Sequence, residues 1–355
     1  MVTTDVQGSK KGTLLVTGGA GFIGSHFVEL AIRSQYNVVV LDALTYAGHR
    51  ENLEQIKDLL TSNTHYDFIH GSIADQQLVS GLLRNYHITG VVNFAAETHV
   101  DRSINGPGEF IETNIAGTFN LLRCALAYYE SLPAEGREKF RYLQVSTDEV
   151  FGSLGPTGKF NEQTPFEPNS PYSASKAAAD FLVHAWFHTY GFPSVTTHCS
   201  NNYGPRQYPE KLIPFMITSA LTEKPLGVYG DGQNVRDWIH VEDHCAGIML
   251  AFETGKTGRR YCFGGNEEWK NIDLVKLICK ELDKLQPCPD GKKYESTITF
   301  VKDRAGHDQR YAIDDSLAQK ELGFKRRYDF RTGLASTVEW YVRNQEWCKK
   351  VIRRK

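Results

Sequence analysis

The chain has 355 residues, 41% of them hydrophobic and 23% charged, with a formal net charge of −2. This composition is typical of a globular protein with a sizeable core, and the length favours two lobes. The 40 basic residues are spread along the chain, and no apolar run approaches the length of a membrane span. Both features argue against nucleic-acid-binding and membrane-spanning classes.

Residues 1–11 lack the apolar region of a secretory signal, and we expect a disordered leader there. The seven cysteines are scattered, odd in number and include no CxxC pair. We therefore expect buried reduced thiols, with neither a disulfide framework nor a zinc site, and no other metal. A cytoplasmic location follows from the reducing compartment that such thiols imply.

From Gly12 to about Ser200, short β-branched runs alternate with longer amphipathic stretches. Several of the runs are apolar without a gap, as in strands that are covered on both faces. The alternation predicts an α/β fold, with a doubly wound parallel-sheet Rossmann domain over residues 12–200. The expected strands lie at 13–18, 37–42, 66–71, 90–95, 142–147 and 194–200, and the expected helices at 25–35, 76–86 and 114–130.

Beyond Ser200, the chain is richer in Gly, Pro and aromatic residues, and we expect long loops between short elements at 201–215, 228–243, 263–273 and 302–314. Binding groups concentrate in such loops. Residues 201–350 are expected to form mainly a smaller, interleaved α/β substrate-binding domain. A later segment, about 235–260, is expected to return to the first domain.

The stretch "LLVTGGAGFIGSHFVELA" (14–31) has the order strand, Gly-rich turn, helix. Its glycines fit two registers, Gly19-x-Gly21-x-x-Gly24 and Gly18-x-x-Gly21-x-x-Gly24, and either lets the backbone approach a pyrophosphate closely. Asp42 ends the next strand, where it would accept hydrogen bonds from the adenosine ribose and favour NAD over NADP. A plain tight turn, with Asp42 as a cap, is the competing interpretation.

Two further patterns point to proton transfer. "SPYSASKAAADFL" places Tyr172 and Lys176 four residues apart near the start of a helix, so both project from one face. A cation beside a tyrosine favours the phenolate and makes it a usable base. "FRYLQVSTDEVFG" ends a strand with Asp148 and Glu149 side by side, which is either a solvated turn or a pair of acid–base groups.

Several motifs together resemble the extended short-chain dehydrogenase/reductase superfamily and, within it, the dTDP-glucose 4,6-dehydratase family. They are "TGGAGFIG", "AAETHVDRS", "STDEVFG", "YSASKA", "SNNYGP", "PEKLIP" and "RDWIHVEDH", and the likeness spans about Gly12 to Trp347. The resemblance implies an NAD-dependent lyase of nucleotide deoxysugar (rhamnose-type) biosynthesis. It would convert dTDP-glucose to dTDP-4-keto-6-deoxy-glucose by oxidation at C4, elimination of water across C5 and C6, and return of the hydride to C6.

The resemblance also implies roles for residues at matching positions. Tyr172 would be the base at the C4 hydroxyl with Lys176 as its activator, Thr147 would bind the C4 oxygen, Asp148 would be the general acid, and Glu149 the base at C5. Because C5 and C6 are neighbours, adjacent acids fit if the backbone turns there, since a regular strand would send them to opposite faces. Repulsion within the pair would keep one acid neutral and the other ionised.

The remaining implied residues fall into two groups. The cofactor residues would be Gly18, Gly21, Phe22, Ile23, Gly24, Asp42, Ser72, Ile73, Ala95, Ala96, Thr98, Thr113 and Asn202, with Tyr172 and Lys176. The substrate residues would be Thr98, Thr147, Asn201, Lys211, Leu212, Val228, Tyr229, Arg236, Asn271, Arg304 and His307. The histidines of "IHVEDH" are expected to serve structure, with Glu242 or Asp243 capping the following helix.

Three positions depart from the family pattern. Ser72 stands in place of an acid and weakens the expected hold on adenine. Phe151 replaces a tyrosine, which we interpret as a packing change, and Ala305 replaces a proline in the nucleotide loop.

Three other functions compete with the dTDP-glucose dehydratase. A UDP-glucose 4,6-dehydratase acts on a substrate whose base lacks the methyl group of thymine, and a pocket discriminates one methyl group by only about 1–3 kcal/mol. A nucleotide-sugar 4-epimerase needs Tyr172 and Lys176 but has no use for the acid pair. A cofactor-binding sensor or scaffold needs none of the five catalytic residues.

The helices expected around 110–131 and 173–190 carry more apolar residues than one buried stripe requires. We therefore expect a homodimer that pairs through them, and no nucleic-acid or membrane partner.

Overall fold

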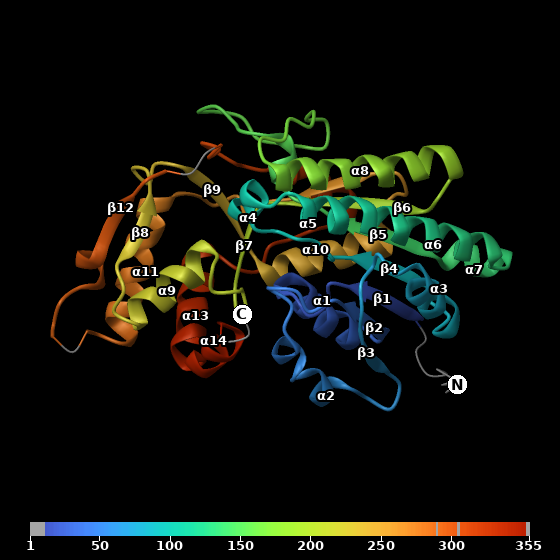
Figure 1. Cartoon of the computed structure of the whole chain (residues 1–355), viewed down its shortest axis with the longest axis horizontal. Coiled ribbons are helices and arrows are strands. Elements are labelled where there is room, and N and C mark those ends of the chain that lie inside the picture. Colours follow the sequence, from blue (N-terminus) through green and yellow to red (C-terminus); the bar gives the residue numbers. More distant parts are fainter. Residues whose placement is uncertain (1–10, 289, 304–305, 353–355) are drawn as a thin grey trace.

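The computed structural model describes residues 11–288, 290–303 and 306–352, which form a larger and a smaller lobe (Figure 1). The expected leader therefore lies outside the described residues, except for Lys11. Within the described ranges, no helix combines the length and apolar character needed to cross a bilayer.

Seven parallel strands form the central sheet of the larger lobe, in the spatial order β10-β6-β5-β4-β1-β2-β3. The strand order reverses between β1 and β4, and open α/β sheets bind ligands at the carboxyl ends of the strands beside such a point. The predicted doubly wound α/β fold is confirmed. The strands are β1 (Thr13–Thr17), β2 (Asn37–Asp42), β3 (Tyr66–His70), β4 (Gly90–Asn93), β5 (Arg141–Val145), β6 (Ser194–Cys199) and β10 (Arg260–Phe263).

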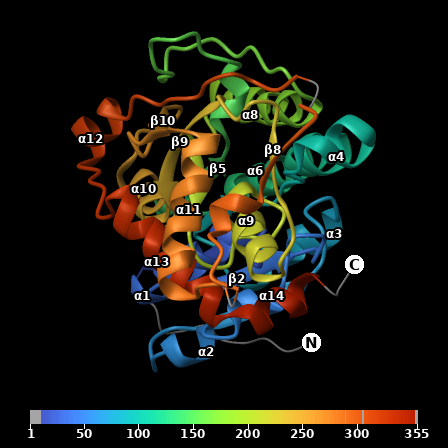
Figure 2. The same cartoon turned by 90° about the vertical axis from the view of Figure 1, so that its left-hand side faces the viewer.

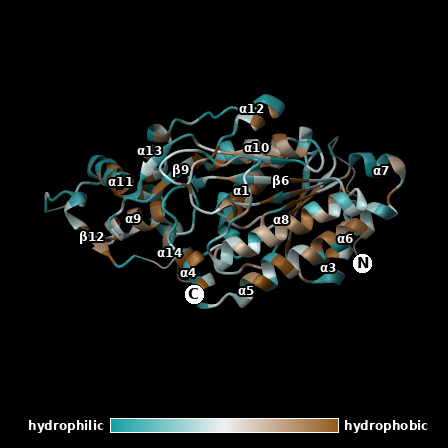
Figure 3. Ribbon diagram, turned by 90° about the horizontal axis from the view of Figure 1, so that it is seen from above, coloured by the Kyte–Doolittle hydropathy of each residue, from teal (hydrophilic) through white to brown (hydrophobic). Residues whose placement is uncertain are grey.

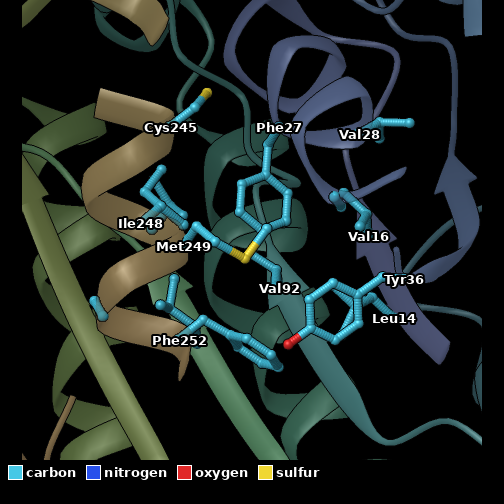
Figure 4. Packing of buried hydrophobic residues seen from close by; sticks show 14 of the residues in the cluster. Leu14, Val16, Phe27, Val28, Tyr36, Val92, Cys245, Ile248, Met249 and Phe252 are labelled. Atoms are coloured by element: carbon cyan, nitrogen blue, oxygen red, sulfur yellow. The ribbon is translucent and has the colours of Figure 1, made fainter. Parts of the chain in front are cut away.

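Helices cover both faces of this sheet. One face packs against α1 (Phe22–Arg33) and α10 (Val241–Thr254) through a buried apolar cluster that includes Phe27, Val92 and Ile248 (Figure 4). The other face packs against α3 (Gln76–Asn85), α6 (Thr118–Ser131) and α8 (Pro171–Tyr190). This double burial explains why the strands are apolar at nearly every position.

Shorter helical segments complete the larger lobe. They are η1 (Arg50–Leu53), α2 (Ile56–Leu59), α4 (Val100–Asn105), α5 (Gly108–Phe110), the π-helical η2 (Ile111–Gly117), α7 (Ala134–Lys139), the 3₁₀ turn η3 (Asp148–Phe151) and α12 (Ser316–Leu322). The segment α10–β10 follows the first part of the smaller lobe in sequence, and α12 follows a later part, yet all three pack with the large sheet.

The smaller lobe has its own apolar core, which packs helices against two small sheets (Figure 2). One sheet has the order β11-β9-β7 and the other pairs β12 with β8 in parallel. The strands are β7 (Asn201–Tyr203), β8 (Leu226–Tyr229), β9 (Val235–His240), β11 (Glu268–Lys270) and β12 (Ile298–Val301). The helices are α9 (Leu212–Leu221), α11 (Asn271–Leu285), η4 (Tyr294–Thr297), α13 (Phe330–Arg343) and α14 (Gln345–Ile352).

Two local expectations were wrong. Three of the four stretches expected as long loops contain regular elements. They are 201–215, with β7 and the start of α9; 228–243, with the whole of β9; and 263–273, with β11 and the start of α11. Neither Glu242 nor Asp243 caps α10, because the ring of His240 accepts the Glu242 backbone N–H and stacks on Tyr328. The Asp243 carboxylate instead accepts two backbone N–H groups from the segment after α12.

Candidate active site

The Gly-rich turn between β1 and α1 brings backbone close to backbone. Gly18 has φ +69°, and a Cβ there would lie 2.6 Å from the backbone nitrogen of Ala95. A Cβ on Gly24 would lie 2.3 Å from the carbonyl oxygen of Gly18, so the helix can approach the turn only without a side chain. Gly21 is the N-cap of α1 and supplies no side-chain cap. The first amides of a long helix therefore face the carboxyl edge of the sheet, where an anion is stabilised.

Asp42 ends β2 beside this turn. Its two carboxylate oxygens accept the backbone N–H groups of Ala20 and Leu44, each at 2.8 Å. Asp42 therefore ties the Gly-rich turn to the next loop, which is the capping role considered as an alternative. Each oxygen keeps a lone pair for a further donor such as a ribose hydroxyl. Burial raises the pKa of Asp42, and the two N–H groups oppose that rise.

The chain turns immediately after β5, as adjacent acid–base groups require. Thr147 is the N-cap of η3, and its hydroxyl oxygen accepts the Glu149 backbone N–H at 3.3 Å. A 3₁₀ turn has three residues per turn, so neighbouring side chains diverge by about 120° and not by the 180° of a strand. Asp148 and Glu149 consequently line the same cavity.

The environment of Asp148 favours its neutral form. The residue is 3% exposed, and burial, followed by the charges of Glu149 and Asp237, raises its pKa well above the usual range. The Thr147 hydroxyl donates to Asp148 Oδ1 at 3.3 Å. A carboxyl whose pKa is raised by burial suits the role of a general acid, which must hold its proton until it donates.

Tyr172 and Lys176 project from the first turns of α8 into the same cavity. The helix starts with Pro171 and a capping box between Ser170 and Ser173, which together fix its first turn. Lys176 is buried, and its ammonium donates to the Val145 carbonyl at 2.8 Å. Burial lowers its pKa, which the carboxylate of Asp180 opposes.

Burial and the charge of Glu149 raise the pKa of Tyr172, whereas its hydrogen bond with Thr147 lowers it. Burial here opposes ionisation of the phenol, and the activation of Tyr172 by Lys176 stays a prediction.

One cavity of about 420 Å³ joins the Gly-rich turn to the acid pair and to α8. Its wall is formed by the carboxyl ends of β1, β2, β4, β5 and β6 and by the start of α9. Twenty-one of the residues singled out in the sequence lie along it: Gly18, Gly21, Phe22, Ile23, Gly24, Asp42, Ser72, Ile73, Ala95, Ala96, Thr98, Thr113, Thr147, Asp148, Glu149, Tyr172, Lys176, Asn201, Asn202, Lys211 and Leu212.

The other expected substrate residues lie outside this wall. Val228 and Tyr229 end β8, Asn271 begins α11, and His307 contacts Tyr229 at a ring-centroid distance of 6.2 Å. The guanidinium of Arg236 donates to the carbonyls of Val235, Asp308 and Gln309 and lies over the ring of Tyr311. Its charge still acts on Asp148. Arg304 and Ala305 lie outside the described residues.

The cavity wall also contains polar residues that the sequence did not single out. Glu97 and Glu210 belong to the motifs "AAETHVDRS" and "PEKLIP", so the motif match was a usable signal for them. Tyr46, whose hydroxyl hydrogen-bonds with that of Thr98 at 2.8 Å, had no such signal. Gln207 likewise follows no local pattern.

Four buried oxygens on this wall have no hydrogen-bond partner within the part of the chain that the structure describes. They are Asp148 Oδ2, Asn201 Oδ1, Gln207 Oε1 and Glu210 Oε1. Buried polar atoms normally have partners, so this grouping suits a ligand rich in hydroxyl groups. Asn202 differs, because its side chain is engaged with His244, Ser200 and Cys199. His244, whose pKa burial lowers to about 3, is a neutral support for that amide.

Phe151 packs against Phe160, Phe166 and His198, in agreement with its interpretation as a packing change.

All seven cysteines are free thiols, and six of them are buried.

Comparison with known proteins places the chain among sugar-nucleotide enzymes. A family model described as GDP-mannose 4,6 dehydratase matches residues 15–337. The dTDP-glucose 4,6-dehydratase of Xanthomonas campestris pv. campestris (strain B100) is 54% identical over 340 residues, 96% of each chain.

Two solved structures separate fold from chemistry. DesIV, a dTDP-glucose 4,6-dehydratase from Streptomyces venezuelae with NAD and TYD bound, aligns with a TM-score of 0.86 and 43% identity, covering 96% of this chain and 99% of that one. The UDP-glucose 4-epimerase of Thermotoga maritima aligns with a TM-score of 0.80 and 26% identity, covering 94% and 99%. Because an epimerase shares the architecture, the fold alone does not select the reaction.

Proposed function

The chain belongs to the family described as GDP-mannose 4,6 dehydratase and, within it, to the dTDP-glucose 4,6-dehydratases, and from this premise we propose that it converts dTDP-glucose to dTDP-4-keto-6-deoxy-glucose with NAD. The observation that carries the proposal is the pair Asp148–Glu149, turned into one cavity with Tyr172 and Lys176. A 4-epimerase has no elimination for such a pair to catalyse. The reaction belongs to nucleotide deoxysugar biosynthesis.

The residues around the Gly-rich turn fit a dinucleotide. The turn leaves no room for a Cβ at Gly18 or Gly24, the amides at the start of α1 suit a pyrophosphate, and Asp42 retains acceptor capacity for a ribose. Bound NAD⁺ supplies the acceptor for the C4 hydride and a positive ring that favours the Tyr172 phenolate. Residues 12–200, with α10, β10 and α12, would form the NAD domain, and the remainder of 201–350 would mainly bind the nucleotide sugar.

The side chains have separate tasks in this mechanism. The Tyr172 phenolate takes the C4 hydroxyl proton, while Thr147 donates a hydrogen bond to the C4 oxygen. The resulting ketone acidifies the C5 hydrogen, which Glu149 removes. Neutral Asp148 then protonates the C6 hydroxyl so that it leaves as water, and Glu149 returns its proton to C5 when C6 is reduced.

The test is to incubate the purified protein with NAD and dTDP-glucose and to weigh the product. We expect the loss of one water without net accumulation of reduced cofactor. An unchanged mass with altered configuration at C4 would identify an epimerase, and binding without turnover would identify a sensor or scaffold.

The thymine base is the finer part of the proposal. The support is identity with dTDP-glucose enzymes over nearly the whole chain. Comparing kcat/KM for dTDP-glucose and UDP-glucose tests it. The two substrates differ by the methyl group of thymine and by the 2′-hydroxyl of the ribose, and the methyl group alone, in a pocket, is worth about 1–3 kcal/mol, or roughly 10–200-fold. A preference for UDP-glucose would make the chain a UDP-glucose 4,6-dehydratase.

We also propose a homodimer that pairs through η2, α6 and α8. The helices α6 and α8 run side by side with apolar residues along both (Figure 3), and four large side chains on these segments are 41–59% exposed: Ile111, Phe119, Phe181 and Tyr190. Large apolar side chains that are exposed on neighbouring helices support an interface there. Light scattering at micromolar concentration should give twice the chain mass, and the Phe119→Asp/Phe181→Asp variant half of that. A monomeric wild type would contradict the proposal.

We also propose that the protein is located in the cytoplasm. Six buried free thiols suit a reducing compartment. Cell fractionation that finds the protein outside the cytoplasm would contradict this.

A further inference from the structure

Asn52, a buried residue of η1, joins the cofactor turn to the smaller lobe. Its side-chain amide donates to the Ala20 carbonyl of the Gly-rich turn at 2.8 Å, and its side-chain oxygen accepts the indole N–H of Trp347, in α14, at 3.2 Å. An indole N–H only donates and a carbonyl only accepts, so these partners fix the orientation of the amide. The Asn52 backbone carbonyl accepts from the Arg206 guanidinium at 3.0 Å. One residue thus connects three distant parts of the chain.

Arg206 fixes the segment after β7 against α1. The residue is buried, and its guanidinium also pairs with the carboxylate of Glu29. The carbonyl of the preceding residue, Pro205, accepts from the His26 ring at 3.0 Å. Arg206 has φ +66°, a left-handed conformation that is uncommon for residues other than glycine and persists where surrounding contacts impose it. Contacts with the larger lobe therefore determine the course of this segment.

The next residues along the chain form part of the cavity wall. Gln207, Tyr208 and Glu210 line the cavity, and Gln207 and Glu210 supply two of the four oxygens that lack a partner among the described residues. The Tyr208 ring stacks on His49 at a centroid distance of 5.4 Å, and the His49 backbone N–H donates to the Ala20 carbonyl at 3.0 Å. This part of the wall is thereby placed relative to the Gly-rich turn.

We propose that Asn52, Arg206 and Trp347 form an interlobe latch, a set of positioning residues that holds this wall in register with the cofactor turn. The inference rests on the proposed function, in which the sugar must lie against the cofactor for hydride transfer. The apparent affinity of a ligand falls with the fraction of the protein in the competent arrangement, and a second ligand that favours the same arrangement restores it. Loss of the latch should therefore weaken binding of both ligands and leave the catalytic groups unchanged.

Two variants break the latch, and neither changes a residue of the cavity wall. Trp347→Phe removes the indole N–H and keeps an aromatic ring. The double variant Glu29→Gln/Arg206→Gln removes the ion pair without leaving one buried charge alone. The matched control is Trp269→Phe, because the Trp269 indole donates to Glu267, at 3.3 Å, within the smaller lobe.

The test measures how fast the cofactor leaves. Holoenzyme with radiolabelled NAD is diluted into excess unlabelled NAD, and release of the label is timed with and without saturating dTDP, which cannot turn over. We expect both latch variants to release NAD at least fivefold faster than wild type, and dTDP to slow their release by a larger factor than that of wild type. With dTDP-glucose, KM should rise at least fivefold while kcat changes less than twofold. Trp269→Phe should match wild type throughout.

Several outcomes would overturn the latch. They are NAD release at the wild-type rate in either latch variant, equally fast release from Trp269→Phe, slowing by dTDP to the same factor in the variants and wild type, and a fall in kcat at unchanged KM. If wild type released no water from dTDP-glucose, or did not bind dTDP in calorimetry, the proposed function would fail instead. The rate of NAD release without nucleotide would still decide the latch.

Discussion

Asp148→Asn tests the proposed role of the acid pair with the smallest change in shape. The amide cannot protonate a leaving hydroxyl, but it retains the contact that Thr147 Oγ1 makes with Oδ1. General acid catalysis contributes about 10²–10⁴-fold, or about 3–5 kcal/mol of activation free energy. We therefore expect elimination to fall by that factor while oxidation at C4 survives. Absorbance of the reduced cofactor follows the oxidation, and the product mass follows the elimination.

The same variant tests the protonation state of Asp148 through stability. Burial raises the pKa of the folded carboxyl well above its usual value of 3.8. Between these two pKa values the unfolded chain has released the proton and the folded chain has not, so wild type loses about 1.4 kcal/mol of stability per pH unit from this group as pH rises. Asn lacks this loss. The free energy of unfolding of Asp148→Asn, relative to wild type, should therefore increase with pH.

Urea unfolding of the NAD-free proteins at several pH values measures this difference. Glu149→Gln is the matched control, because it removes the charge that helps to raise the pKa of Asp148 and should end the slope at a lower pH. A difference that stays constant with pH would mean that Asp148 is ionised in the folded protein. Full dehydration by Asp148→Asn would refute its role as the acid.

Two further substitutions probe the cofactor turn and the base. Gly24→Ala places a Cβ 2.3 Å from the Gly18 carbonyl oxygen, so it should lower the free energy of unfolding by about 1–3 kcal/mol and weaken NAD binding, which calorimetry measures. The control is Gly81→Ala on α3, where the new Cβ meets open space and should raise the free energy of unfolding by about 0.5–1 kcal/mol. Equal effects of the two substitutions on the free energy of unfolding would contradict the steric argument. Asp180→Asn removes the charge that raises the pKa of Lys176, so Lys176 should lose its proton at lower pH. In a profile of kcat/KM against pH, the fall in activity on the alkaline side should therefore move to lower pH. If the alkaline fall in kcat/KM stays at the same pH, Lys176 does not cause it.

The large sheet was predictable because its signals are local. Each strand is buried on both faces and reads as an apolar run, and each crossover helix has its own amphipathic stripe. The start of α1 was placed too late, since the helix begins at Phe22 and includes Gly24. A glycine inside a helix normally weakens it, but here the missing side chain allows the close approach to Gly18. Because that contact is a tertiary one, it leaves no periodic pattern in the sequence from which the start of the helix could be predicted.

The smaller lobe was harder to predict because its elements depend on distant partners. Strand β9 carries Arg236 and Asp237 and is stabilised by pairing with β7 and β11. Helix α9 contains Pro214 in its first turn, where proline is tolerated although it resembles a loop signal. The π-helical segment η2 interrupts a longer helix without any local sequence sign.

The candidate site was predictable as far as its motifs reach. The motif positions predicted that Tyr172, Lys176 and the acid pair meet at one site, and in the structure all four residues line one cavity. The contacts of Thr147 with the Asp148 carboxyl and the Glu149 backbone depend on the 3₁₀ turn after β5 and could not be read from spacing.

The most direct measurement uses dTDP-glucose that carries deuterium in place of hydrogen at C4. The purified protein with unlabelled NAD should release a product that has lost one water and holds the deuterium at C6. Deuterium retained at C4, or a sugar that keeps all of its oxygen atoms, would contradict the account.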